Sequence, residues 1–209
     1  MSPADELVRL DPSFAPVVER AGPRRLRPRD PDGPLGALVR AITHQQLAGA
    51  AAVAIHSRVR ALMPGPLTPE AILAVPEDAF RTAGLSAAKT AAVLDLATRV
   101  ASGEVPLNRL GRLADDEIVS RLVHVRGIGR WTAEMFLIFQ LRRPDVWPVD
   151  DLGVRRGFAL VHGLAESPTP RRLEALGEAL RPMRSLAAWY CWEAVHLTRR
   201  GVEISLRDL

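Results

Sequence analysis

Residues 122–139 read LVHVRGIGRWTAEMFLIF, and this stretch decides the fold class. Two apolar, helix-like runs flank the segment VRGIG, which is too short for anything but a tight turn. Gly127 and Gly129 in this turn permit a positive φ or a close approach of backbone. The run that follows begins with amide N–H groups that lack helical partners and suit an anion such as a phosphate. We therefore expect two helices joined by a tight hairpin over about residues 115–141, whose main-chain groups can bind a DNA backbone without reading its sequence.

The rest of the chain also places apolar residues at helical spacing, and only residues 202–206 are ambiguous with a strand. Residues 35–62 form one broad helical stripe without proline, which Pro64 ends. Residues 1–34 are rich in proline and arginine, so we expect a solvated loop there. Further helices are expected over residues 69–75, 77–83, 86–101, 115–123, 130–141, 151–161, 169–180 and 183–199. The predicted fold class is all-α.

The composition sets the broad class of protein. The chain has 209 residues, of which 47% are hydrophobic and 25% charged, as in a soluble globular protein of one domain or two small lobes. Its single cysteine, Cys191, excludes an internal disulfide and a four-cysteine iron–sulfur cluster. No apolar run is long enough to span a membrane and no signal peptide is evident, so we expect a cytoplasmic protein. The net charge of +4 weakly favours an anionic partner.

A second informative stretch, residues 142–158, reads RRPDVWPVDDLGVRRGF. Pro148 favours an extended conformation for the residue before it, and Asp150 and Asp151 then open the next apolar helix. Aspartate at such a position routinely caps the helix. The two roles can coexist, with one aspartate capping the helix and the other pointing into a cleft.

Taken together, VRGIGRWTAEMF and DVWPVDDLGVRRGF resemble the helix-hairpin-helix (HhH-GPD) DNA glycosylase superfamily, and within it the AlkA-like 3-methyladenine DNA glycosylase II branch. LVRAITHQQLAGAAAVAI, RTAGLSAAKTAAVLDLA and RPMRSLAAWYCW are similar to further family segments, so the resemblance spans roughly residues 35–195. It implies two helical lobes that flank a cleft, without an N-terminal β-domain. One lobe comprises residues 1–35 and 151–209, and the other comprises residues 36–150.

The resemblance implies a monofunctional glycosylase that flips alkylated purines out of double-stranded DNA and hydrolyses their N-glycosidic bonds in base excision repair. Asp151 matches the family's catalytic carboxylate, and Asp150 is left to cap or orient. The base pocket is formed by Trp131, Met135 and Trp192. Met135 stands where related enzymes carry a tyrosine, which implies a less aromatic pocket. The residue that fills the stack after base flipping is Gln46, with Gln45 as the alternative.

A single carboxylate suits this chemistry. Cleavage of a glycosidic bond builds positive charge on the sugar, which a nearby carboxylate stabilises. Purines methylated at N3 or N7 are already cationic, so they leave without a strong general acid, and aromatic rings hold them by cation–π contact. Relatives that also nick the strand use a lysine amine, but Trp131 stands at that position and Lys89 is the only lysine. We therefore expect no lyase activity.

The resemblance also assigns the residues that contact the DNA backbone. These are Gly127, Gly129, Arg130 and Thr132. The carbonyls that hold a sodium or potassium ion in relatives belong to Val123, Val125 and Ile128. No cofactor is expected to be required. Lys89, Arg155 and Arg184-Ser185 are each either phosphate contacts or ordinary surface and capping groups.

Other interpretations remain open at this point. A helical corner whose glycines only end a helix would explain the turn alone. A non-catalytic helix-hairpin-helix DNA-binding protein would need neither Asp151 nor an aromatic pocket. A helical scaffold for protein–protein contacts would use the aromatic residues purely as core. The leading hypothesis is the glycosylase, acting as a monomer associated with a bacterial type of nucleoid.

Overall fold

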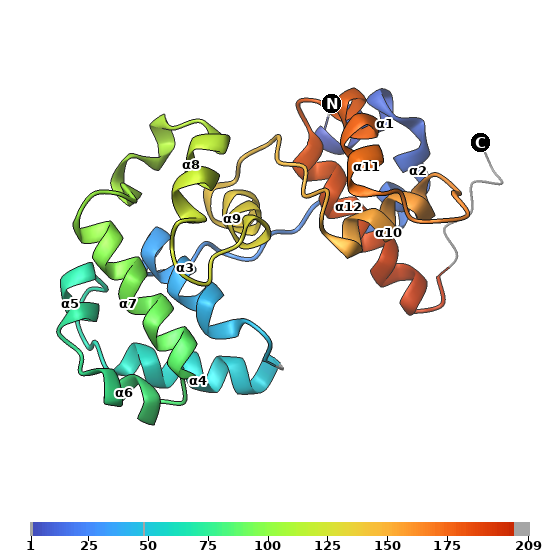
Figure 1. The fold of residues 1–209 in the computed structure, drawn as a ribbon. Helices are drawn as coiled ribbons and strands as arrows, with labels where there is room; N and C mark the ends of the chain where they lie inside the picture. Colours follow the sequence, from blue (N-terminus) through green and yellow to red (C-terminus); the bar gives the residue numbers. More distant parts are fainter. Residues whose placement is uncertain (1, 48, 203–209) are drawn as a thin grey trace. The chain divides into compact units, whose positions relative to one another are not determined.

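The computed structural model describes residues 2–47 and 49–202, and within them every regular element is helical (Figure 1). This confirms the all-α prediction. The helices fall into two compact units, one formed by Met1–Arg27 with Arg142–Leu209 and the other by Pro28–Leu141. We call them the terminal unit and the central unit. Residues 203–206, in the stretch of ambiguous strand character, lie outside the described residues.

The unit boundaries differ from the predicted divisions at 35/36 and 150/151. Residues 28–32 belong to the central unit because the amide of Asp30 donates to Gln140 and the carboxylate of Asp32 pairs with Arg60. Residues 142–150 belong to the terminal unit, where Asp145 pairs with Arg184. These long-range bonds are invisible in the helical spacing on which the sequence division relied.

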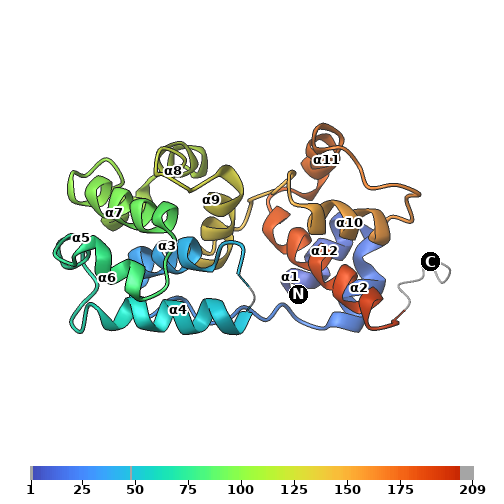
Figure 2. The same ribbon diagram turned by 60° about the horizontal axis from the view of Figure 1, so that its bottom comes forward.

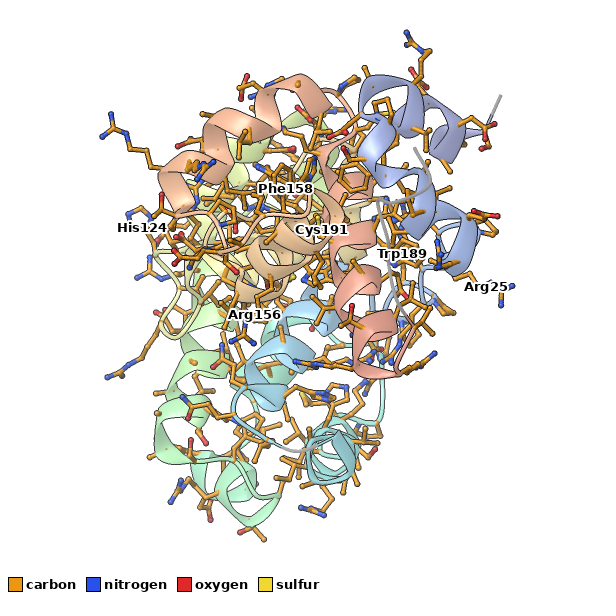
Figure 3. All side chains as sticks on the ribbon, turned by 90° about the vertical axis from the view of Figure 1, so that its right-hand side faces the viewer. Arg25, His124, Arg156, Phe158, Trp189 and Cys191 are labelled. Atoms are coloured by element: carbon orange, nitrogen blue, oxygen red, sulfur yellow. The ribbon has the colours of Figure 1, made fainter. Side chains whose placement is uncertain are left out.

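The terminal unit packs the first and last helices of the chain around one apolar core. Helices α10 and α12 lie side by side, and Figure 3 shows Phe158 of α10 with Trp189 and Cys191 of α12, while Arg25 projects outward. Burial raises the pKa of the Cys191 thiol well above its ordinary value. The elements of this unit are α1 (Pro3–Leu10), α2 (Ala15–Ala21), α10 (Leu152–Val161), α11 (Pro170–Gly177), α12 (Arg184–Arg199) and the 3₁₀ turns Pro12–Phe14 and Glu178–Leu180.

The prediction of a solvated loop over residues 1–34 is wrong for its first two thirds. Ser2 caps α1 in a reciprocal capping box with Asp5, and Asp11 caps the following 3₁₀ turn. The prolines stand at the first helical positions, where proline is tolerated. Leu7, Phe14 and Val17 are fully buried. The prolines therefore start short helices instead of preventing them.

The central unit surrounds α3 with helices (Figure 2). Helix α3 contacts α4, α7 and α9. Its buried residues include Leu38, Val39 and Ile42. The elements of this unit are α3 (Gly33–His44), α4 (Gly49–Ala61), α5 (Pro69–Leu73), α6 (Glu77–Thr82), α7 (Ala87–Ala101), a 3₁₀ turn (Leu107–Arg112), α8 (Asp115–Leu122), α9 (Arg130–Phe136) and a π-helical turn (Leu137–Leu141).

The expected single helix over residues 35–62 is divided into α3 and α4. Helix α3 ends at His44, Gln45 is extended with ψ 132°, and Gln46 has a φ of +55°. A non-glycine residue rarely adopts a positive φ without support from its surroundings. The break therefore depends on tertiary bonds, which are described below.

Candidate functional site

The terminal unit holds the predicted catalytic carboxylate at the N-terminus of α10. Asp151 caps this helix, since its Oδ1 accepts a hydrogen bond from the amide of Val154 at 2.8 Å. The same oxygen accepts the indole Nε1–H of Trp192 at 2.9 Å. The side chain is 9% exposed. The expectation that Asp150 would provide the cap is wrong, because Asp151 itself provides it and Asp150 is exposed.

Gly153 makes room for this arrangement. A Cβ atom at Gly153 would lie 2.8 Å from Cδ1 of Trp192 and 3.0 Å from Oδ1 of Asp151. Real Cβ atoms essentially never approach other heavy atoms closer than 3.0 Å. The missing side chain thus lets the indole ring lie over the first turn of α10 and reach the carboxylate.

The segment that precedes Asp151 is tied to α12. Arg184 Nε donates to Asp145 Oδ1 at 2.8 Å and Nη2 to Oδ2 at 2.9 Å, which is a bidentate ion pair. Ser185 Oγ accepts from the amide of Val146 at 2.9 Å. Arg184 is only 12% exposed, so it positions this segment; of the two roles considered for Arg184-Ser185, a structural one fits this ion pair better than a phosphate contact. Arg155 likewise holds a loop, through Pro168 O.

The central unit holds the hairpin between α8 and α9. Gly127 has a φ of +76°, which favours glycine, and the amide of Ile128 donates to Val125 O at 3.0 Å to close the turn. Val125 and Ile128 are buried, while Gly127, Gly129 and Arg130 are exposed. Gly129 caps α9 without a side-chain hydrogen bond. The start of α9 thus presents main-chain amides, which at a helix N-terminus suit an anion.

The side chains of the first turn of α9 differ in exposure. Arg130 is exposed, and its Nε donates to Glu134 Oε1 at 2.9 Å. Thr132 is buried, so only its main chain is available to a phosphate. Trp131 is 49% exposed, and Met135, one turn later on the same face of α9, is half-buried. Trp192, the third predicted pocket residue, belongs to the terminal unit beside Asp151.

The turn between α3 and α4 carries the predicted wedge. Gln46 is exposed at the break, and its φ is +55°. Gln45 Nε2 instead donates to Gly127 O in the hairpin at 2.8 Å. This bond favours Gln46 over Gln45 as the residue that can enter the base stack.

Lys89 is bound to the main chain near the C-terminus of α3. Its Nζ donates to the carbonyls of Thr43 at 2.8 Å and Gln45 at 2.6 Å. It is therefore not a freely solvated surface charge, because two of its three N–H donors are bound to the main chain. Its one signal in the sequence is that it is the only lysine among 28 basic residues, which indicates no partner.

The described residues contain neither a membrane-spanning helix nor a cluster of metal-binding side chains. No helix among them is long and apolar enough to cross a membrane. No cluster of three or more histidine, cysteine, aspartate or glutamate side chains among them is arranged to hold a metal ion.

Comparisons with known proteins identify the family to which the chain is similar. Residues 39–182 match the family model described as HhH-GPD superfamily base excision DNA repair protein. The chain is 36% identical to DNA-3-methyladenine glycosylase 1 of Schizosaccharomyces pombe, over 90% of this chain and 84% of that protein. The solved structure of the S. pombe 3-methyladenine DNA glycosylase with abasic DNA matches with a TM-score of 0.79, covering 92% of this chain and 96% of that one at 36% identity. A Bacillus halodurans DNA-3-methyladenine glycosidase matches with a TM-score of 0.87, covering 97% and 93% at 34% identity.

Proposed function

Since the chain belongs to the HhH-GPD superfamily of base excision DNA repair proteins, we propose that it releases 3-methyladenine and 7-methylguanine from double-stranded DNA. The family match and the structural match confirm the superfamily and the glycosylase fold that the hairpin and the aspartate pair predicted. The chain is thus a base excision repair glycosylase, and the non-catalytic alternative has no support.

The observation that carries the proposed mechanism is the position of Asp151. Two donors, the Val154 amide and the Trp192 indole, meet at Oδ1 and fix the orientation of the carboxylate. The N-terminus of α10 and the near-complete burial of the side chain give this negative charge a preorganised, weakly screened environment. A carboxylate held in this way stabilises the positive charge that develops on the deoxyribose as the base leaves. It also orients the attacking water and accepts its proton.

The aromatic residues supply the second part of the proposal. Trp131 and Trp192 offer ring faces that attract a cationic purine, at about 0.5–2 kcal/mol for each contact. Met135 adds a polarisable contact on the same face of α9 as Trp131. Because N3- and N7-methylated purines are already cationic, binding and leaving-group ability both favour them over normal bases.

The central unit is proposed to grip the DNA. The main chain of the exposed residues Gly129 and Arg130 would bind a phosphate, and Gln46 would fill the gap left by the flipped base. Neither contact reads sequence. The affinity for undamaged duplex should accordingly fall steeply as salt increases.

We further propose a sodium or potassium ion at the hairpin. In the described part of the chain the carbonyls of Val123 and Ile128 accept no hydrogen bond, and that of Val125 accepts only the amide of Ile128. Main-chain carbonyl oxygens with free lone pairs can coordinate hard cations. A bound ion would add positive charge next to the phosphate-binding amides. DNA affinity that is equal in potassium and tetraalkylammonium salts of the same ionic strength would count against this ion.

The reaction is proposed to be monofunctional. The amine of Lys89 already donates to two carbonyls in the central unit, which leaves it unsuited to attack a sugar. We therefore place the enzyme in the type II class of 3-methyladenine glycosylases without lyase activity. Treatment with borohydride during turnover should trap no covalent protein–DNA adduct. We also propose that it needs no cofactor for the chemistry and acts as a cytoplasmic monomer at a bacterial nucleoid.

The direct test is a release assay. The protein is incubated with duplex DNA treated with a methylating agent, and free purines are separated by chromatography. We expect 3-methyladenine and 7-methylguanine, with abasic sites left in the DNA and no strand nicks. Binding of the same DNA without release of any base would overturn the proposal.

A further inference from the structure

The turn that carries Gln46 is held from one side by helix α7. Lys89, in the first turn of α7, donates two hydrogen bonds to main-chain carbonyls of residues 43 and 45. These carbonyls lie at the C-terminus of α3, where the helix leaves its last carbonyls without partners and favours a positive charge. The ammonium group therefore satisfies the end of α3 at the point where the chain breaks towards α4.

The same side of α7 also contacts the hairpin. A Cβ at Gly127 would lie 3.3 Å from the Cβ of Ala92, so the hairpin backbone packs closely on this helix. Asp95 Oδ2 accepts the amide of Arg126 at 2.7 Å. Lys89, Ala92 and Asp95 are spaced three residues apart and thus share one side of the helix.

A direct bond completes the arrangement. Gln45 Nε2 donates to Gly127 O at 2.8 Å, which joins the turn to the hairpin across 82 residues of sequence. Gln46, the next residue, projects from this support with a positive φ and an exposed side chain. Its unusual backbone conformation is therefore flanked by bonds on its N-terminal side to both α7 and the hairpin.

We propose that Lys89 is a positioning residue for base flipping: it fixes the turn that carries Gln46 at a set place relative to the phosphate-binding hairpin. This inference rests on the proposed role of Gln46 as the wedge. Helix α7 then holds both the turn between α3 and α4 and the hairpin between α8 and α9, the two segments of the central unit that we propose contact DNA. When the hairpin binds a phosphate, the side chain of Gln46 is then already positioned to enter the base stack.

The chemistry of lysine fits this role. Burial lowers the pKa of the Lys89 amine below its ordinary value, as expected for an ammonium group withdrawn from water. A lysine has a compact charge and three donors, which suits two carbonyls on one turn. A methionine at this position would keep the apolar stem and lose the donors.

The test compares two DNA duplexes of the same sequence. One is fully paired, and the other carries a tetrahydrofuran abasic analogue, which leaves a gap for the wedge. The ratio of the two dissociation constants measures the wedge contribution. We expect Gln46→Ala to abolish the preference of the wild type for the gapped duplex. We expect Lys89→Met to reduce it by about tenfold, which corresponds to about 1.4 kcal/mol, and Lys89→Arg to restore part of it.

Arg81→Met is the matched control. Arg81 Nη1 donates to Leu85 O at 2.9 Å, so this variant also removes a cationic donor from a carbonyl beside α7, but one that does not touch the wedge turn. It should keep the full preference for the gapped duplex even where it lowers Tm. If Lys89→Met does not fold, Lys89→Gln, which retains an amide donor, replaces it.

The outcomes distinguish the wedge role of Gln46 from the positioning role of Lys89. Loss of the preference in Gln46→Ala but not in the Lys89 variants would overturn the positioning role and leave the wedge intact. Retention of the preference in Gln46→Ala would overturn the wedge assignment and the positioning role with it. An equal loss of the preference for the gapped duplex in Lys89→Met and Arg81→Met would show that a general loss of stability causes the effect. This result would also overturn the proposal.

Discussion

In the proposed mechanism, Asp151 in the terminal unit and the hairpin in the central unit bind their ligands in opposite ways. Asp151 acts through a side chain that is 9% exposed and oriented by two donors. The hairpin would act through main-chain amides at the start of α9, next to a buried valine, a buried isoleucine and Gly127. A developing sugar cation needs one charge at one place, whereas a phosphate accepts several weak donors.

The two regions should therefore be sensitive to different substitutions. The carboxylate can be removed by one substitution without disturbing the fold. The amides cannot be removed by changing a side chain, so the hairpin is sensitive only where backbone geometry depends on a particular residue. Changes in the terminal unit should therefore affect the rate of base release, and changes in the hairpin should affect DNA affinity.

Asp151→Asn should have the largest effect. Asparagine caps helices as well as aspartate and can still accept from the Trp192 indole, so only the charge is lost. We expect the single-turnover rate of base release to fall by about a thousandfold, while DNA affinity is retained. Asp150→Asn is the matched control, since Asp150 is the exposed neighbour, and it should keep most of the rate. Equal losses in both variants would remove the distinction.

Gly153→Ala should have the next largest effect. The added Cβ would displace the Trp192 ring or the Asp151 carboxylate. A misplacement of about 1 Å at a reacting group can cost roughly a hundredfold in rate, and we expect a loss of this order in kcat. Alanine favours helix more than glycine does, so helix propensity cannot cause the loss. Gly111→Ala, which places its Cβ in open space, should be neutral in the same steady-state assay.

Gly127→Ala should lower DNA affinity and leave the rate at saturation unchanged. Gly127 has a φ of +76° and its Cβ would press on Ala92, whereas Gly129 has a φ of −90° and open space around it. Strain of this kind costs about 1–3 kcal/mol, and we expect about a tenfold loss of affinity for any duplex sequence by fluorescence anisotropy. In urea unfolding, Gly129→Ala should be the milder variant; the reverse order would contradict this account of the turn.

The smallest expected effect is a pH dependence confined to the central unit. Burial lowers the pKa of His44 below 6.5, and the positive charges of Arg40 and of protonated His56 lower it further. Burial also lowers the pKa of His56. As the pH falls below about 6.5, the unfolded chain binds protons that the folded unit resists, so stability is lost. Hydrogen exchange should show weaker protection of α3 and α4 at about pH 5.5 than at about pH 7.5, with α10 and α12 little changed.

His44→Leu with His56→Leu should reduce this dependence. His44 Nε2 and His56 Nδ1 are buried and have no hydrogen-bond partner among the described residues, so a leucine loses no bond from those atoms. A pH profile that is the same in the double variant would assign the effect to other groups.

Local signals in the sequence were sufficient for most of the helices. Ser86 and Thr169 cap α7 and α11 as residues of their type are expected to do. The apolar spacing gave the central and C-terminal helices within a few residues. The motif over residues 122–158 was sufficient for the family, because a glycine hairpin followed by an aspartate pair is specific in combination.

The features that could not be predicted from the sequence depend on contacts between residues that are far apart along the chain. The break at Gln46 is supported by Lys89, more than 40 residues away, and by the bond from Gln45 to Gly127. The role of Gly153 depends on a tryptophan that joins it only in the folded unit. Arg184 resembled a phosphate ligand because its partner, Asp145, lies 39 residues earlier. Helical periodicity contains no information on such pairs.

The most direct test of the central claim is the affinity for a cationic sugar analogue. A duplex carrying a protonated pyrrolidine in place of the target deoxyribose mimics the charge of the transition state, and one carrying tetrahydrofuran is its neutral control. The wild type should bind the cationic analogue at least about tenfold more tightly, and Asp151→Asn should bind both equally. Equal binding of both analogues by the wild type, or an undiminished preference in Asp151→Asn, would contradict the account.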